Sequence, residues 1–248
     1  MAIDNWWWVA GLAAFLVGLS KGGLPAVGTL GVPALSMVMS PVQAAALLLP
    51  IFVASDVVSV WLYRRHYSAA TLRILIPAGL LGVLVGWLMA SMVSDNAVKL
   101  LVGTIGVVFC LHTWLRKPVT GPAKAPQVGQ GLLWGGLSGF TSFIAHAGAP
   151  PFQVYVLPQQ LPKAVFAGTS TLFFAVINAA KIPPYQHLRP YDSTLLGQAA
   201  WLLPAALLGT VAGAYLTRRI TDAWFYRLVQ TGLFLMSLKL VYDALFKG

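Results

Sequence analysis

The hydrophobic pattern of the chain consists of long apolar runs separated by short polar segments. About 20 consecutive apolar residues are needed for one helix to cross a bilayer, and runs of this length recur along almost the whole sequence. In the first half they predict helices near 42–63, 72–93 and 97–115, the last with Asp95 as its N-cap. The pattern therefore predicts an all-α polytopic membrane protein.

Two of the apolar runs are interrupted by residues that end helices. The run in the first half is interrupted by SKGGLP at 20–25. The run in the second half is interrupted within FTSFIAHAGAPPFQVYVL at 140–157. Pro150 and Pro151 lack backbone donors, and a residue before proline is pushed out of the helical region. We expect one helix to end near 146–148 and a short one to begin at the prolines. Two half-length helices that meet at such a break commonly build the binding site of a transporter.

The second half of the sequence repeats the first. Residues 77–86 and 204–213 share six identities in ten positions, and GVP at 31–33 corresponds to GAP at 148–150. Each half then contains a broken-helix or hairpin element followed by three full transmembrane helices. We expect a first repeat at residues 1–115, a linker at 116–128 and a second repeat at 129–248.

The orientation of the two repeats depends on how the broken segments cross the membrane. A hairpin, or two separate crossings, gives each half odd parity and inverts the repeats, whereas one kinked helix gives parallel repeats. Short basic clusters occur at 64–65, 116–117 and 218–219, and basic loops favour the cytoplasmic side. Placing all three clusters inside requires the inverted arrangement, with a cytoplasmic linker, although Lys181 and Arg189 then fall outside.

The composition limits the classes of function. Hydrophobic residues make up 58% of the chain and charged residues 9%, which excludes a soluble globular protein. The net charge of +10 lies mainly in the short clusters between apolar runs, so we expect no nucleic-acid binding. Glutamate is absent and there are six aspartates, a composition that favours an anion over a cation as cargo. Residues 1–5 contain Asp4 and no basic residue, so the first apolar run is expected to stay in the mature chain.

Three segments carry a resemblance to a known family. These are SKGGLPAVGTLGVP at 20–33, SGFTSFIAHAGAPPFQVYVLP at 138–158 and AGTSTLFFAVINAAKIPPY at 167–185. With the internal repeat, they resemble the TauE/SafE, or sulfite exporter, family of bacterial membrane transporters. The resemblance implies a multi-pass inner-membrane carrier of sulfur-containing anions such as sulfite, sulfoacetate or other organosulfonates. It leaves the cargo and the direction of transport open.

Lys21 and the adjacent glycines are the candidate site at the first break. A lysine near mid-membrane costs about 2.5–3.5 kcal/mol, so Lys21 either reaches an interface, caps its helix or neutralises an anion in a cavity. Gly22 and Gly23 allow close backbone approach and expose N–H groups, and Gly148 is expected to do the same at the second break. No second cation aligns with Lys21 in the other half, which leaves backbone amides as the expected further donors.

The second half supplies the other candidate residues. His146 is either a hydrogen-bonded core residue or a substrate contact that can change charge near neutral pH. Gln153 either donates to an oxyanion or joins two helices, and the polar cluster of Thr169, Ser170 and Asn178 either packs between helices or contacts cargo. We interpret Lys181 as an interfacial residue. Asp56, from the first half, is left open between ion pairing, proton transfer and a helix contact.

Two other classes of function compete with a carrier. The sequence GLSG at 136–139 matches the nucleophile motif of rhomboid-type intramembrane serine proteases, but His146 follows only eight residues later on the same segment. A channel lined by the two breaks is the other alternative. We expect no enzyme and no cofactor. The expected partners are a small anion and the lipid bilayer, while a homodimer and a coupling proton or ion remain open.

Overall fold

A computed structural model of the chain describes residues 2–28, 30–35, 38–39, 41–90, 92, 94–115, 123–188 and 190–246. No strand occurs among these residues, so the prediction of an all-α fold is confirmed. The helices are α1 (Ala2–Lys21), α2 (Pro25–Gly28), α3 (Gly31–Leu35), α4 (Pro41–Tyr63), α5 (Ala69–Leu88), α6 (Asp95–Leu115), α7 (Val128–Ala145), α8 (Ala149–Val156), the 3-10 helix η1 (Leu157–Gln159), α9 (Lys163–Leu188), α10 (Ser193–Arg219) and α11 (Asp222–Phe246).

Six helices in the described part of the chain are long and apolar enough to cross a membrane: α4, α5, α6, α9, α10 and α11. A shorter apolar helix covers Trp6–Lys21 within α1. Large apolar side chains cover the outer faces of the bundle, and Trp201 is 79% exposed. Such side chains would be unfavourable in water over so large a surface, and the lipid bilayer is their natural environment.

Both predicted helix breaks are present. α1 ends at Lys21 and α2 begins at Pro25, while α7 ends at Ala145 and α8 begins at Ala149 with Pro150 in its first turn. Proline is tolerated there because its missing N–H would have no partner inside the helix. The sequence therefore predicts where the two membrane segments are interrupted.

Two predicted helix boundaries differ in the structure. The helix expected at 72–93 begins at Ala69, where the Ser68 hydroxyl accepts a hydrogen bond from the Thr71 amide. It ends at Leu88. The predicted end at Val93 lies outside the described residues. Asp95 is the first residue of α6 rather than its N-cap, because the Ser94 hydroxyl accepts from the Ala97 amide at 3.2 Å. Serine is a good N-cap, so the neighbour takes the role expected of the aspartate.

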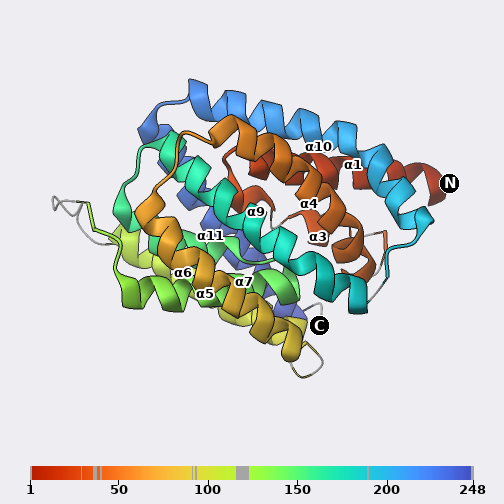
Figure 1. The fold of residues 1–248 in the computed structure, drawn as a ribbon, viewed down its shortest axis with the longest axis horizontal. Coiled ribbons are helices and arrows are strands. Elements are labelled where there is room, and N and C mark those ends of the chain that lie inside the picture. Colours follow the sequence, from red (N-terminus) through yellow and green to blue (C-terminus); the bar gives the residue numbers. More distant parts are fainter. Residues whose placement is uncertain are drawn as a thin grey trace.

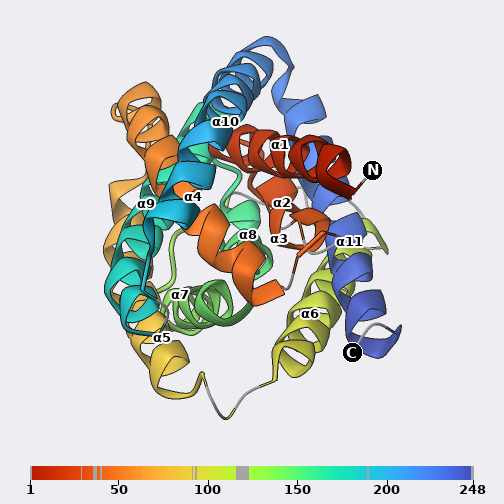
Figure 2. The same ribbon diagram turned by 90° about the vertical axis from the view of Figure 1, so that its right-hand side faces the viewer.

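The long helices surround the short ones. Viewed end-on, α2, α3 and α8 lie near the middle, with α1 and α10 along one side, α5 and α7 along another and α6 and α11 along a third (Figures 1 and 2). α4 and α9 pack against each other beside this centre. The two breaks therefore meet inside the bundle, where α2 contacts α8.

Corresponding segments of the two halves make corresponding contacts. α1 packs against α10 as α7 packs against α5, and glycines allow the backbones of both helix pairs to come close together. A Cβ atom added at Gly82 would lie 2.0 Å from the Gly136 carbonyl oxygen, and one added at Gly209 would lie 2.2 Å from the Phe15 carbonyl oxygen. Gly82 and Gly209 are matched in the sequence repeat. Close backbone contact at both positions requires a residue without a side chain.

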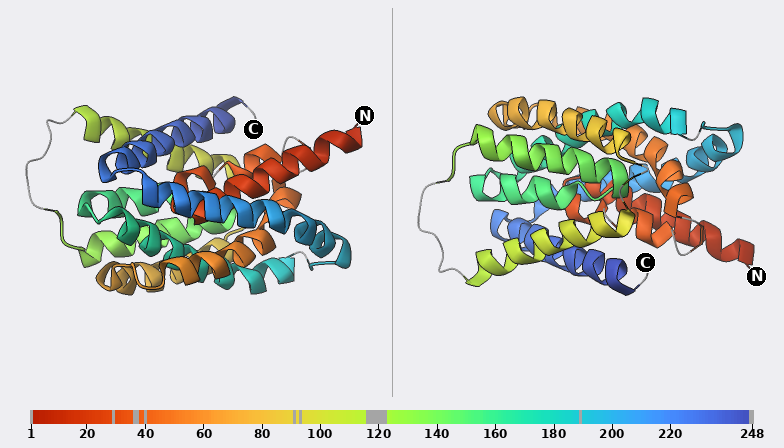
Figure 3. Two further views of the ribbon diagram at one scale, coloured as in Figure 1. Left: turned by 90° about the horizontal axis from the view of Figure 1, so that it is seen from above. Right: turned by 90° about the horizontal axis from the view of Figure 1, so that it is seen from below.

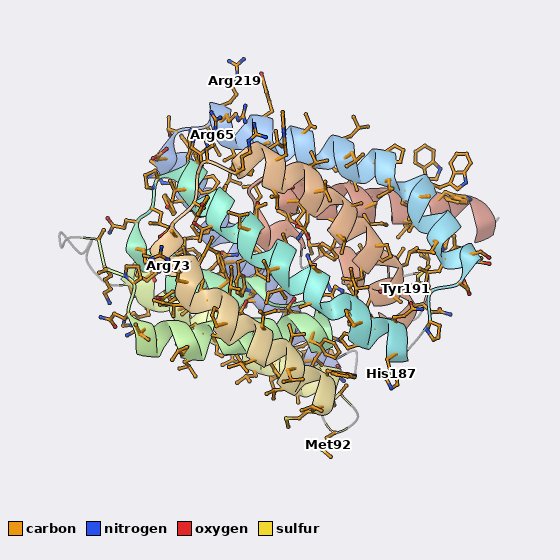
Figure 4. The ribbon with its side chains drawn as sticks, in the orientation of Figure 1. Arg65, Arg73, Met92, His187, Tyr191 and Arg219 are labelled. Atoms are coloured by element: carbon orange, nitrogen blue, oxygen red, sulfur yellow. The ribbon has the colours of Figure 1, made fainter. Side chains whose placement is uncertain are left out.

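Helices that correspond in the repeat run in opposite directions along the bundle (Figures 3 and 4). α5 runs from the end marked by Arg73 toward Met92, whereas α10 runs from Tyr191 toward Arg219 (Figure 4). Arg65, at the end of α4, lies at the same end as Arg73 and Arg219 (Figure 4). This geometry is the one that inverted repeats require, and the inversion itself stays a prediction.

Candidate functional site

The first break is held by hydroxyl groups from two neighbouring helices. The Gly22 carbonyl accepts from the Tyr63 hydroxyl of α4 at 2.6 Å and from the Thr217 hydroxyl of α10 at 3.1 Å. Gly23 has φ +121°, which side-chain-bearing residues rarely adopt. The end of α1 is therefore fixed in position, and with it the side chain of Lys21.

The second break is held by hydroxyl groups of the helix that it ends. His146 adopts the left-handed conformation, with φ 52°, and so terminates α7. The Ser138 hydroxyl donates to the Gly148 carbonyl at 2.7 Å, and the Thr141 hydroxyl donates to the Ala147 carbonyl at 3.1 Å. Ser138 is the serine of the GLSG motif, and its hydroxyl is used in this contact.

Lys21 forms a buried ion pair. Its ammonium lies 2.6 Å from Asp56 Oδ1, and both side chains are only 6% exposed. The second carboxylate oxygen, Oδ2, accepts from the Asn178 side-chain amide at 2.8 Å. The pair links α1 to α4, and Asn178 extends it to α9, so the contact joins both halves of the chain. Asp56 therefore pairs with a basic group, one of the roles left open by the sequence.

Lys181 is a second buried cation, and its interpretation as an interfacial residue is wrong. Its side chain is 1% exposed, and its ammonium donates to the carbonyl and the hydroxyl of Ser142, each at 3.2 Å. In the part of the chain that the structure describes, no carboxylate lies within ion-pair distance of this group. No cation aligns with Lys21 in the sequence repeat, but α9 brings Lys181 to the same cavity.

These groups face one cavity between the two breaks. Its aromatic wall includes Phe52 and Phe174, whose ring centres lie 5.0 and 5.9 Å from the Lys21 ammonium. His146 is 8% exposed, its Nδ1 lies 3.5 Å from the Tyr185 hydroxyl, and its Nε2 has no hydrogen-bond partner among the described residues. The residues that line the cavity are Ser20, Lys21, Pro25, Gly28, Phe52, Ser142, His146, Gly148, Ala149, Ser170, Thr171, Phe174, Asn178 and Lys181.

The structure brings together five of the nine predicted site residues. The cavity wall contains Lys21, His146, Gly148, Ser170 and Asn178, whereas Gly22, Gly23, Thr169 and Gln153 do not line it.

The four remaining residues have other surroundings. A Cβ atom added at Gly23 would lie 2.6 Å from the Thr217 hydroxyl oxygen. Gly22 lies against the backbone of α10, where an added Cβ would approach Ala214 N at 2.5 Å. Thr169 accepts a hydrogen bond from the Ser68 amide at 2.9 Å. Gln153 is fully buried, and neither atom of its amide has a partner among the described residues. Whether any of the nine contacts cargo stays a prediction.

The cavity also contains residues that sequence reasoning missed. Lys181 is the second cation at the cavity and is held by Ser142, while Phe52 and Phe174 flank Lys21. The spacing of Asn178 and Lys181, three residues apart, could have indicated a shared helix face. No group of three or more histidine, cysteine or acidic side chains that could hold a metal ion occurs in the described parts of the chain.

Comparison with family models finds one that describes the sulfite exporter TauE/SafE and matches residues 10–240. Comparisons with curated proteins and with solved structures find no match. The matched region covers nearly the whole chain, including both breaks and every residue that lines the cavity. The chain therefore belongs to the sulfite exporter TauE/SafE family of membrane transporters.

Proposed function

We propose that the protein is a secondary transporter that moves a small sulfur-containing anion across the bacterial inner membrane. The cargo class is sulfite, sulfoacetate or another organosulfonate, carried by alternating access. The observation that carries the proposal is the pair of buried lysines at one cavity, of which only Lys21 has a carboxylate partner among the described residues. A buried cation without a counter-ion is costly, and an anionic cargo would balance it.

An anion that leaves water needs several donors at once, and the cavity wall contains them. Lys181 has three N–H donors, of which Ser142 takes two, and Lys21 lies at the same cavity. His146 Nε2 can donate to an oxyanion when that nitrogen carries the proton, and the Ser170 hydroxyl adds a fourth polar group. These side chains form a donor set that suits a sulfite or sulfonate group.

The two-fold organisation supports alternating access. We propose that residues 1–115 and 129–248 are inverted repeats, and that one rocks against the other around the cavity. Lys21 and Phe52 come from the first repeat, and His146, Asn178 and Lys181 from the second. Relative motion of the repeats would therefore separate the groups that surround the cargo.

The proposed topology places the end marked by Arg65, Arg73 and Arg219 in the cytoplasm, together with the linker at 116–128 (Figure 4). Reporter fusions after Lys124 and at the C-terminus test this placement. We expect the two fusions to report opposite sides of the membrane. The same side for both would contradict the inverted repeats.

The transport activity is tested with purified protein in proteoliposomes. Vesicles loaded with sulfite, sulfoacetate, methanesulfonate or chloride are diluted into a trace of labelled sulfite, and uptake is followed. A carrier shows uptake stimulated by cargo on the opposite side, whereas a channel does not. Stimulation by a sulfur-containing anion and not by chloride is the expected result. Equal, unstimulated flux of all anions would favour a channel, and no flux of any would contradict the proposal.

A further inference from the structure

Asp56 occupies an unusual position behind the cavity wall. Its carboxylate binds Lys21 and Asn178, two residues that line the cavity, but Asp56 itself does not line it. The side chain is 6% exposed. It therefore contributes a fixed negative charge close to the cargo position without offering an atom to the cargo.

The charges around the cavity can be counted helix by helix. α1 contributes Lys21, α4 contributes Asp56 and α9 contributes Lys181. Counted with all three groups ionised, they sum to a net charge of +1. Among the described residues, the other titratable groups at this region are His146, at the end of α7, and Tyr185 on α9. Both are counted in their neutral forms, because a charged imidazole would add a third positive charge beside the two lysines.

A cavity of low dielectric favours cargo that cancels its charge. Coulomb interactions are several times stronger there than in water, so a single unbalanced charge weakens binding strongly. A cargo of charge −1 brings the total to zero, whereas a cargo of charge −2 leaves an uncompensated negative charge next to Asp56.

We propose that Asp56 sets the valence of the cargo, so that the site selects anions of charge −1, such as hydrogensulfite or an alkanesulfonate, over anions of charge −2, which include sulfoacetate and the sulfite dianion. This inference rests on the proposed function and specifies its substrate class. Asp56 is a specificity-determining residue that acts through the charge balance and not through contact. Lys181 is then the cation that the cargo neutralises, and the Lys21–Asp56 pair is internally balanced.

Methanesulfonate and sulfate are a suitable pair of probes. Both are tetrahedral and similar in size, and they differ mainly in one unit of charge. Binding is measured with purified full-length protein, from the rise in melting temperature with anion concentration at constant ionic strength. We expect the wild-type protein to prefer methanesulfonate by about tenfold or more, the effect of roughly one well-placed charge.

Three variants change the charge count in different ways. Asp56→Asn keeps the side-chain shape and raises the count to +2, so the preference should shift toward sulfate by about tenfold. Lys21→Met combined with Asp56→Asn removes the balanced pair and returns the count to +1. This variant should bind both anions more weakly, because Lys21 lines the cavity, but its preference for methanesulfonate should return. Lys181→Met lowers the count to zero and should lose the affinity for both anions.

The outcomes separate this inference from the proposed function. Anion binding with an unchanged preference in Asp56→Asn would overturn the valence role and leave the transport proposal standing. Absence of binding of either anion, and of sulfite, to the wild-type protein would overturn both. If Asp56→Asn does not fold, the double variant still decides the question, because loss of its preference for methanesulfonate would contradict the charge count.

Discussion

At the first break, helices from elsewhere in the chain hold the backbone: the Gly22 carbonyl accepts from Tyr63 of α4 and Thr217 of α10. At the second break the chain holds itself, because Ser138 and Thr141 of α7 donate to the carbonyls that follow the helix. The first break carries an ion pair, and the second carries the imidazole of His146.

The comparison shows that the repeat duplicates the scaffold and not the chemistry. Corresponding helices pack against each other in the two halves, and the glycines at 82 and 209 allow close backbone contact in each. The buried charges are not matched, because the first half contributes a lysine and an aspartate, and the second half a lysine held by neutral groups. In the proposed carrier, this asymmetry leaves Lys181 as the cation for the cargo.

The largest effect on transport is expected from removing that cation. Lys181→Met should lower the transport rate of a sulfur-containing anion by about 100-fold, equivalent to roughly 2.8 kcal/mol, because the cargo loses its counter-charge. Initial rates in proteoliposomes measure the loss. Lys124→Met, at an exposed lysine before α7, is the matched control and should retain the wild-type rate. Wild-type transport in Lys181→Met would show that the cargo does not use this lysine.

Removing the cation of the first break should instead affect stability. Lys21→Met leaves the Asp56 carboxylate buried without its ion-pair partner and should reduce the free energy of unfolding by about 3–5 kcal/mol. Adding Asp56→Asn removes the orphaned charge and should restore most of that loss. Unfolding followed in detergent provides the comparison. Equal stability of the single and double variants would mean that the pair does not fix the first break.

The left-handed residue of the second break can be tested with two substitutions. His146→Gly suits φ 52°, whereas His146→Ala puts a Cβ atom into an unfavourable conformation, so the alanine variant should be less stable by about 1 kcal/mol. Both variants lack the imidazole, and both should transport more slowly than the wild-type protein. Alanine as stable as glycine would contradict the role of this conformation in ending α7.

The smallest effect is expected at the hydroxyl that holds the first break. Tyr63→Phe removes the bond to the Gly22 carbonyl and should destabilise the protein by about 1 kcal/mol or less, because Thr217 still donates to the same oxygen. Tyr242→Phe, at a tyrosine that is 54% exposed, is the control and should leave the melting temperature unchanged. A loss as large as that of Lys21→Met would reverse the order of importance proposed for this break.

The sequence predicts the parts of the fold that local signals determine. Apolar length predicts the long helices, and proline next to glycine predicts both interruptions, because these residues restrict the backbone wherever they stand. The end of α5 and the cap of α6 are less well predicted, since several neighbouring residues can fill those roles. The sequence favours Asp95 as the cap of α6, but Ser94 caps the helix.

The candidate site is less predictable because its members meet only through tertiary packing. Lys21 is visible as a lone charge at a break, but its partner Asp56 lies on α4 and its companion Lys181 on α9. Two prolines follow Lys181, at 183 and 184, and such a pair predicts a helix end and hence an interfacial lysine. In the structure α9 continues through both prolines to Leu188, which leaves Lys181 deep inside the bundle.

The most direct test of the central claim is to locate a bound anion in the protein. Selenite has the shape and charge of sulfite, and its selenium atom gives an anomalous X-ray signal that identifies its position in a crystal. We predict one strong peak in the cavity, within hydrogen-bond distance of the Lys181 ammonium and close to His146 and Ser170, and its absence in Lys181→Met. A peak elsewhere in the bundle, or one that persists without Lys181, would contradict the account.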